Sequence, residues 1–278
     1  MNKRVVLNDG RTMPCIGFGC FRLPADRLKQ VIESALDAGY RYFDTATRYE
    51  NERAVGLALR LSGVPRASLH VVSKLWPTSF HEARRGIEYS LSELNLDYID
   101  GYYLHWPGIH PDMRYRAWEA MLEMQQRGLI QSVGVSNFTI GQLEDLIARF
   151  GVRPTVNQIE IHPWYPEQAL ADWCKAHGIQ VASWSPVFRG RAVTEPVLAR
   201  IGAAYGKTGA QAVLRWHVEK GYIPLPKSGD PGRLKENFDI FDFSLSSDDA
   251  AAIASLENGE HLGDDPETFD GGTFMPGR

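Results

Sequence analysis

Residues 42–49 read Tyr-Phe-Asp-Thr-Ala-Thr-Arg-Tyr. In this stretch a short apolar run ends at the carboxylate of Asp44, and a small polar turn then leads to an isolated tyrosine, Tyr49. Parallel sheets carry their active sites outside the carboxyl ends of the strands. The stretch therefore predicts a strand that delivers an acid to the functional rim of such a sheet.

Two later apolar runs end in the same way. Residues 69–73 lead to Lys74, and residues 101–104 lead to His105. If the three runs are neighbouring parallel strands, their end groups lie at one rim together with Asp44. A titratable group at three consecutive strand ends indicates a candidate catalytic site.

The rest of the chain alternates short apolar runs with amphipathic stretches of helical spacing. Apolar runs are found at 16–18, 42–43, 71–72, 102–104, 130–135, 156–161, 179–184 and 222–225, and the helical stretches that follow them span 28–38, 52–61, 82–94, 114–126, 142–150, 167–176, 197–220 and 233–238. Eight strand–helix units predict an α/β fold, a (β/α)₈ TIM barrel, which needs about 250 residues.

An open doubly wound sheet is the alternative fold. Residues 17–19 (Gly-Phe-Gly) lack the third glycine of a dinucleotide fingerprint, and no acid follows at the required distance. Asn8, Asp9 and Gly10 lie between two apolar segments and predict a tight N-terminal β-hairpin that caps the bottom of the barrel. We expect residues 1–278 to form one domain, with an irregular C-terminal segment, 258–278, near the barrel mouth.

Composition excludes several classes of protein. The 278 residues are 44% hydrophobic and carry a net charge of −4, so no basic surface predicts nucleic acid or membrane binding. The cysteines, Cys15, Cys20 and Cys174, match no metal-site spacing and no disulfide framework. No apolar run approaches the ~18 residues of a membrane helix. We expect a soluble, cytoplasmic monomer without a metal ion.

The four end groups suit proton delivery to a carbonyl oxygen. A phenol has a pKa near ~10, and a nearby ammonium lowers it. Asp44 would keep a buried Lys74 charged, Lys74 would tune Tyr49, and His105 would donate a hydrogen bond to the substrate. Taken singly, the acid could be a helix cap, the lysine a surface residue and the histidine part of a packed junction.

Short motifs along nearly the whole chain resemble those of the aldo-keto reductases. The matching segments are residues 7–14, 44–46, 49–52, 73–76, 105–107, 134–138, 157–163 and 226–228. Within that family the chain looks most like the prokaryotic 2,5-diketogluconate reductase group, through residues 184–186, 211–217 and 241–243.

The resemblance implies an oxidoreductase that uses NADPH without a Rossmann domain. It implies that Tyr49 is the general acid, that Asp44 and Lys74 tune it, and that His105 orients the carbonyl. It further implies cofactor contacts from Ser136, Asn137 and Gln158 to the carboxamide, Trp184 to the nicotinamide face, Ser185 to the cofactor, and Glu236 and Asn237 to the adenine. An isolated strand tryptophan such as Trp184 is also a common core residue.

A basic turn after the eighth predicted strand indicates a phosphate site without reference to the family. Lys227, Ser228 and Arg233 cluster where barrels often bind phosphate, and they are good donors to a 2′-phosphate. This favours NADPH over NADH. The alternative is a solvated basic turn without a ligand.

The seventh loop departs from the glycine-rich run of the closer relatives. Val187, Phe188 and Arg189 are bulkier than that run, so the pyrophosphate contacts predicted from the family are open here. Arg189 or Arg191 could contact phosphate instead.

Aromatic residues predict the substrate pocket. The resemblance implies walls from Phe21, Trp76 and Trp106, which suit apolar ligands. The irregular tail could add a lip through Phe269 and Phe274. We expect reduction of small aldehydes, dicarbonyls and keto-sugars. A cofactor-binding regulatory protein with little turnover is the second hypothesis, and a metal-dependent barrel hydrolase, for which the chain lacks a clear ligand set, is the third.

Overall fold

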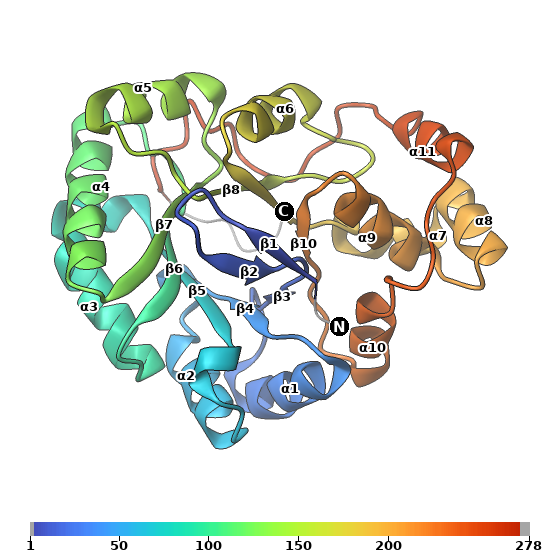
Figure 1. Ribbon diagram of the computed structural model, residues 1–278, viewed down its shortest axis with the longest axis horizontal. Helices are drawn as coiled ribbons and strands as arrows, with labels where there is room; N and C mark the ends of the chain where they lie inside the picture. Colours follow the sequence, from blue (N-terminus) through green and yellow to red (C-terminus); the bar gives the residue numbers. More distant parts are fainter. Residues whose placement is uncertain (1–2, 273–278) are drawn as a thin grey trace.

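The computed structural model describes residues 3–272 and has a closed ring of parallel strands inside a layer of helices (Figure 1). The strand order follows the sequence from β3 to β10. The strands are β3 (Phe18–Gly19), β4 (Tyr42–Asp44), β5 (His70–Leu75), β6 (Ile99–Leu104), β7 (Ile130–Ser136), β8 (Val156–Glu160), β9 (Gln180–Trp184) and β10 (Ile223–Leu225).

Backbone hydrogen bonds join the first and last strands of the sheet. The amide of Gly17 donates to the carbonyl of Pro224 at 3.0 Å, and that of Gly19 donates to Pro226 at 3.1 Å. The ring therefore has no free edge on this side, as a barrel requires. The predicted (β/α)₈ barrel is confirmed, and the doubly wound sheet is excluded.

Helices pack around the outside of the ring. The α-helices are α1 (Ala25–Ala38), α2 (Glu52–Leu61), α3 (Ala83–Leu94), α4 (Pro111–Gln126), α5 (Ile140–Phe150), α6 (Gln168–Ala176), α7 (Arg191–Thr194), α8 (Pro196–Ala204), α9 (Gly209–Glu219), α10 (Pro231–Phe238) and α11 (Ser247–Ala254). The 3₁₀ turns are η1 (Thr47–Tyr49), η2 (Arg66–Ser68), η3 (Pro77–Glu82) and η4 (Phe188–Gly190).

One helix prediction was wrong, and helix α11 was missed. The stretch 197–220 is two helices, because Gly206 has a positive φ of 67° and Thr208 begins α9 with a capping box. Helix α11 was not predicted at all. Its short sequence has one buried apolar residue, Ile253, so its apolar periodicity is weak, although Ser246 caps it with Asp249.

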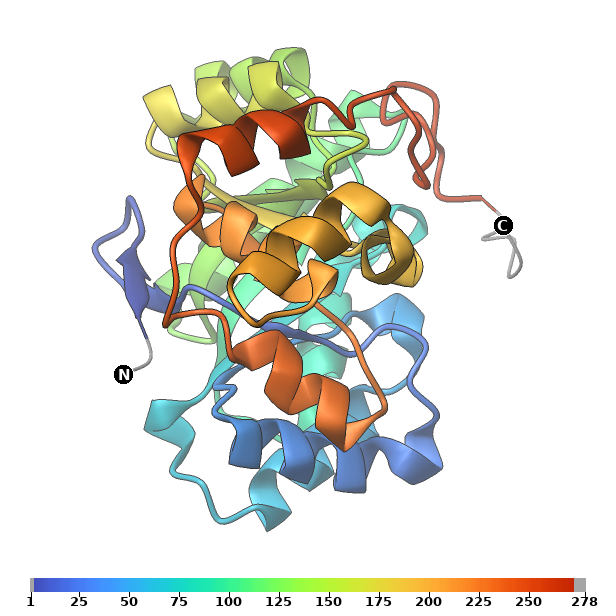
Figure 2. The ribbon, with the colours of Figure 1, turned by 90° about the vertical axis from the view of Figure 1, so that its right-hand side faces the viewer.

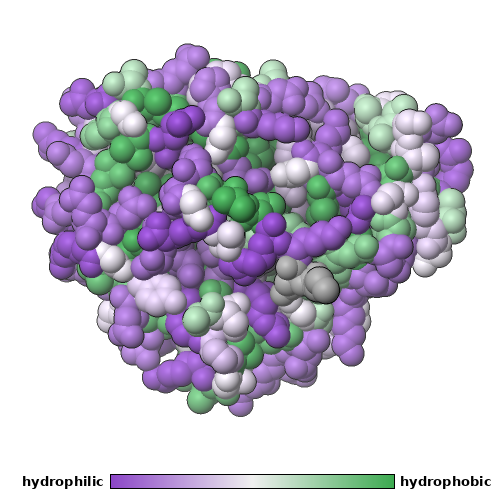
Figure 3. Space-filling view, in the orientation of Figure 1, coloured by the Kyte–Doolittle hydropathy of each residue, from purple (hydrophilic) through white to green (hydrophobic). Residues whose placement is uncertain are grey.

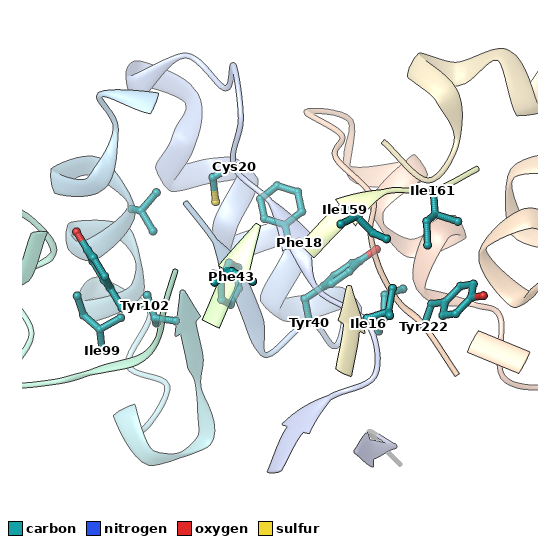
Figure 4. Packing of buried hydrophobic residues seen from close by; sticks show 14 of the residues in the cluster. Ile16, Phe18, Cys20, Tyr40, Phe43, Ile99, Tyr102, Ile159, Ile161 and Tyr222 are labelled. Atoms are coloured by element: carbon teal, nitrogen blue, oxygen red, sulfur yellow. The ribbon is translucent and has the colours of Figure 1, made fainter. Parts of the chain in front are cut away.

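Side chains alternate between two cores because strand residues point alternately to opposite faces. Outward residues such as Phe43 and Tyr102 pack against the helices in the larger cluster, part of which appears in Figure 4. Inward residues fill the barrel in a second cluster made of Leu7, Met13, Tyr42, Val72, Tyr103, Val156, Ala182, Ile223 and Leu225.

The predicted N-terminal hairpin closes one end of the barrel. Strands β1 (Arg4–Val6) and β2 (Thr12–Pro14) pair antiparallel, and Leu7 and Met13 extend the inner core. Figure 1 looks onto this end, and Figure 2 shows the hairpin and the C-terminal tail on opposite sides of the molecule. On the hairpin side, apolar residues form small groups among hydrophilic ones (Figure 3).

Gly56 allows α2 to approach the end of α3 closely. A Cβ at position 56 would overlap the backbone carbonyl of Leu94, which cannot move away as a side chain could. We predict that Gly56→Ala lowers the free energy of unfolding by about 1–3 kcal/mol, as overpacking does. Gly141→Ala in α5 is the matched control, since no atom lies within 4 Å of its Cβ. Urea unfolding measures both, and equal stabilities would contradict the prediction.

Candidate active site

Tyr49 is brought over the barrel mouth by the turn that follows β4. The amides of Tyr49 and Glu50 donate to Ala46 and Thr47 carbonyls, which closes the 3₁₀ turn η1. The Thr47 hydroxyl donates to the carbonyl of Lys74 at 3.0 Å and ties the turn to β5. The phenol of Tyr49 therefore lies above the strand ends, on a turn that is outside the sheet.

Lys74 is fully buried, with 0% of its side chain exposed, and its ammonium has three acceptors. Its Nζ donates to Asp44 Oδ1 at 2.5 Å, to the carbonyl of Thr45 at 2.9 Å and to the Tyr49 hydroxyl at 3.4 Å. These three use all the protons of the charged amine. The predicted meeting of acid, cation and phenol is present in the structure.

His105 faces the same phenol from the end of β6. Its Nε2 lies 3.5 Å from the Tyr49 hydroxyl, and its carbonyl accepts from Asn137 Nδ2 at 3.0 Å. Burial, together with the charge of Lys74, lowers the pKa of His105 well below its usual value. The ring is therefore neutral at physiological pH and carries one N–H.

The protonation of Tyr49 differs from the prediction. Burial, with contributions from Asp44 and Cys20, raises the pKa of the phenol well above its ordinary value. The predicted lowering of this pKa by Lys74 was the wrong direction, because burial, the largest cause, and the Asp44 carboxylate both favour the protonated phenol. Burial also lowers the pKa of Lys74, and the Asp44 carboxylate opposes that change.

A polar layer beside these groups contains four predicted cofactor residues. Gln158 Nε2 donates to Asp44 Oδ2 at 2.8 Å, and the Ser136 hydroxyl donates to the Gln158 carbonyl at 2.7 Å. Trp184 Nε1 donates to Asn137 Oδ1 at 2.8 Å. Asn137 has a positive φ of 61°, which asparagine tolerates better than most residues. The half-buried indole is thereby held at the mouth in one orientation.

The basic turn lies between β10 and α10. The Ser228 hydroxyl accepts from the Asp230 amide at 3.0 Å, and Asp230 caps the helix by accepting from the Arg233 amide at 2.8 Å. Burial and the charge of Arg22 lower the pKa of Lys227. Lys227 of this turn thus lies near a helix N-terminus and near the cation of Arg22, which belongs to the loop after β3.

The remaining predicted cofactor residues flank this turn and the seventh loop. On α10, Glu236 is half-buried and Asn237 is buried. Ser185 follows Trp184 directly, with a positive φ of 51°.

The seventh loop is anchored by its bulky residues. Phe188 is buried despite a positive φ of 47°, and its ring lies 4.1 Å from His162 and 5.3 Å from Trp164. Arg191 lies over Trp164 and pairs with Glu260 at 2.5 Å. The guanidinium of Arg191 therefore contacts the loop and the tail, whereas the side chain of Arg189 is exposed.

Aromatic rings line the mouth next to Tyr49. Phe21 lies 5.0 Å from Tyr49, and Phe269 packs on Trp106 at 4.7 Å and on Trp76 at 5.7 Å. The predicted pocket walls and one of the two lip residues therefore come together. The other lip residue, Phe274, lies outside the described residues.

Two open hollows were found on the described surface. One of about 470 Å³ adjoins the mouth and is lined in part by Arg48, Trp76 and Gly271. A larger one of about 710 Å³ lies between α1 and α10, near Gly39 and Phe238, and contains none of the candidate site residues. The smaller hollow is the candidate approach to the site, because it is lined by Trp76, which belongs to the predicted pocket wall.

Glu160 was missed in the sequence, although it ends β8 in an acid as Asp44 ends β4. Its buried carboxylate accepts from the amides of Leu262 and Gly263, both at 2.8 Å, and lies 2.9 Å from His162 Nε2. A Cβ at Gly263 would lie 3.1 Å from the ring of Trp184. Glu160 therefore fixes the tail against the indole at the mouth.

The tail has further anchors on the loops of the barrel. Gln142 Nε2 donates to the carbonyl of Pro266 at 3.2 Å, and Trp76 Nε1 donates to that of Gly271 at 2.9 Å. Residues 258–272 contain no helix or strand.

Among residues 3–272, no three His, Cys, Asp or Glu side chains are grouped so that they could hold a metal ion. Within the same part of the chain, no helix is long and apolar enough to cross a membrane.

Comparisons with known proteins agree with this geometry. Residues 16–258 match the model of the Aldo/keto reductase family. The chain is 42% identical over 269 residues to a methylglyoxal reductase, DkgA, of Escherichia coli, and the match covers 96% of this chain and 98% of the relative.

Two solved structures have the same fold. A crystal structure of an aldo/keto reductase from Brucella melitensis has a TM-score of 0.89 and 40% identity, and covers 92% of this chain and 100% of its own. A mutant of Gox0644 in complex with NADPH has a TM-score of 0.92 and 35% identity, with 97% and 99% covered.

The Glu160 contact generates a prediction about the tail. In Glu160→Gln the amide can accept only through its oxygen, so one of the two tail amides loses its acceptor. Because hydrogen bonds to charged groups contribute about 1.5–3 kcal/mol, the amides of Leu262 and Gly263 should exchange about ten- to hundredfold faster. Amide hydrogen exchange measures this.

Glu267→Gln is the control, because Glu267 accepts from the Thr139 hydroxyl at the exposed surface. Equal exchange in Glu160→Gln and the wild type would show that the carboxylate does not hold the tail.

Proposed function

Because the chain belongs to the aldo/keto reductase family, we propose that it reduces small carbonyl compounds to alcohols with NADPH and that Tyr49 is its general acid. The observation that carries the proposal is the buried Asp44–Lys74 pair, whose ammonium lies 3.4 Å from the Tyr49 hydroxyl. Family membership establishes the class of oxidoreductase, and the proposal assigns the residues.

The raised pKa of Tyr49 ensures that a proton is present on the phenol when the substrate is bound. The phenol keeps its proton at neutral pH and gives it to the oxygen of the carbonyl, which becomes strongly basic as it is reduced. The Lys74 ammonium then stabilises the phenolate that remains. Asp44 keeps that ammonium charged in a buried site, where it would otherwise tend to lose its proton.

His105 would position the substrate. Its Nε2 lies 3.5 Å from the Tyr49 hydroxyl, and in the tautomer with the proton on Nε2 both groups would donate to one carbonyl oxygen. This arrangement polarises the carbonyl before the proton moves.

The cofactor supplies the hydride when it is bound. Ser136, Asn137 and Gln158 offer hydroxyl and amide groups for a carboxamide, and the fixed indole of Trp184 offers a flat face to a nicotinamide ring. Lys227, Ser228 and Arg233 would hold the 2′-phosphate, with Ser185, Glu236 and Asn237 further along the dinucleotide.

The substrates we propose are small aldehydes, dicarbonyls and keto-sugars. Phe21, Trp76, Trp106 and Phe269 give an apolar, aromatic wall beside the phenol. The relative from Escherichia coli that is named a methylglyoxal reductase supports a dicarbonyl substrate. One domain over residues 1–278, a monomeric state and a cytoplasmic location stay predictions.

Turnover of Tyr49→Phe tests the general acid. We expect kcat with methylglyoxal to fall by about 10²–10⁴-fold, as loss of a general acid does, while NADPH still quenches tryptophan fluorescence. Full activity of this variant would remove Tyr49 from the mechanism. If the wild type is equally inert on aldehydes, dicarbonyls and keto-sugars but binds NADPH, the regulatory hypothesis replaces the reductase.

Replacing Lys227 tests the phosphate site. Lys227→Met should raise the Kd of NADPH about tenfold and reduce its salt dependence, but leave the Kd of NADH unchanged, because only NADPH carries the 2′-phosphate. Lys29→Met on the exposed face of α1 is the control. An equal loss for both cofactors would contradict a 2′-phosphate contact.

The same titrations with Arg189→Ala examine the seventh loop. Unchanged affinity and salt dependence in that variant would exclude a phosphate contact from Arg189.

A further inference from the structure

Two tyrosines occupy the barrel interior beneath Asp44. Tyr42 on β4 and Tyr103 on β6 are fully buried and belong to the inner core, whose other members are aliphatic. Neither was predicted as a site residue, because in the sequence each belongs to an apolar run. A buried phenol must bond its hydroxyl or lose free energy, so their partners matter.

The Tyr42 hydroxyl contacts the Asp44 carboxylate. It donates to Asp44 Oδ2 at 3.3 Å, and the side chains of Tyr42 and Tyr103 interact with each other in the inner core. A phenol has one proton, and a carboxylate only accepts. The proton of Tyr42 is therefore the one given to the Asp44 carboxylate.

Glycines next to the two rings make room for them. A Cβ at Gly17, just before β3, would collide with the ring of Tyr42, and one at Gly134 on β7 would lie 2.6 Å from Cδ1 of Tyr103. A Cβ at Gly101, on β6 itself, would lie 3.1 Å from the Tyr103 hydroxyl. Three positions in and beside the barrel strands thus lack side chains where the two phenols lie, so the barrel is shaped around this pair.

We propose that Tyr42, supported by Tyr103, is a positioning residue that holds Asp44 in place for proton transfer from Tyr49. The proposal rests on the reductase function proposed above. Asp44 accepts from Lys74 at Oδ1 and from Gln158 and Tyr42 at Oδ2. The carboxylate is therefore held both by polar residues of the mouth and by a tyrosine of the inner core. Loss of the Tyr42 donor frees the carboxylate to rotate away from the ammonium.

The two contacts on Oδ2 have different consequences. Gln158 lies in the polar layer where the cofactor is expected, so its replacement would disturb cofactor binding as well. Tyr42 lies on the opposite side of the carboxylate, within the apolar core, and touches neither substrate nor cofactor. Its effect should therefore appear in the chemical step alone.

Tyr42→Phe tests the proposal, because it removes one oxygen and keeps the ring. We expect kcat for methylglyoxal reduction to fall about tenfold, the effect of one hydrogen bond of about 1.4 kcal/mol, with the KM of the substrate and the Kd of NADPH unchanged. Tyr103→Phe should lower kcat by a smaller factor, again with KM and Kd unchanged. It replaces Tyr42→Phe as the test variant if Tyr42→Phe does not fold. Unchanged kcat in the folded variants would overturn the proposal.

Tyr102→Phe is the matched control. Tyr102 is the neighbouring residue on β6, but it points outward into the cluster of Figure 4, and its hydroxyl lies 3.0 Å from Ser90 Oγ. This variant loses a buried hydroxyl without contact to Asp44, so its kcat should equal that of the wild type. An equal loss of kcat in Tyr102→Phe and Tyr42→Phe would mean that any buried hydroxyl has this effect, and the proposal would fail.

A double-mutant cycle with Asp44→Asn locates the effect. If Tyr42 acts through the carboxylate, adding Tyr42→Phe to Asp44→Asn should lower the residual kcat no further, whereas independent, multiplicative losses would overturn the proposal. Tyr49→Phe separates the two hypotheses. If Tyr49→Phe is fully active, the general-acid assignment fails; if it is inactive but Tyr42→Phe matches the wild type, only the positioning role fails.

Discussion

The buried ion pair between Lys74 and Asp44 determines which other groups must lie at the barrel mouth. A charged amine removed from water is costly, and its attraction to one carboxylate offsets that cost only when the other protons also find acceptors. Here the carbonyl of Thr45 and the hydroxyl of Tyr49 complete the set. The loop after β4 therefore has to return across the barrel mouth, because the ammonium needs both of these groups.

The barrel supplies this pair through strict alternation along its strands. Along β4 the inward positions run from Tyr42 to Asp44, and along β5 from Val72 to Lys74. Tyr42 and Val72 belong to the inner core with the hairpin residues, and Asp44 and Lys74 form the ion pair at the mouth. A shift of one residue in either strand would exchange the inward and outward faces, so packing of the inner core also maintains the register of the site.

Much of this arrangement could be predicted from the sequence, because strand ends are local signals. The apolar run before Asp44 and the spacing of α2 need no knowledge of distant residues. Contacts between distant segments gave no such signal: Glu160 is recognisable only once the tail is seen over Trp184. The pKa of Tyr49 was predicted in the wrong direction for a related reason, since burial of the phenol, the largest cause of its raised pKa, depends on the whole fold.

The hairpin and the tail lie at opposite ends of the molecule (Figure 2). A linker attached at β1 would face away from the mouth, so protein fixed to a solid support through it would keep its entrance open to solvent. A linker attached near Gly271 would begin next to the rim of the pocket, because the carbonyl of Gly271 accepts a hydrogen bond from Trp76. The choice of attachment point therefore decides the orientation of an immobilised preparation and the access of small molecules to it.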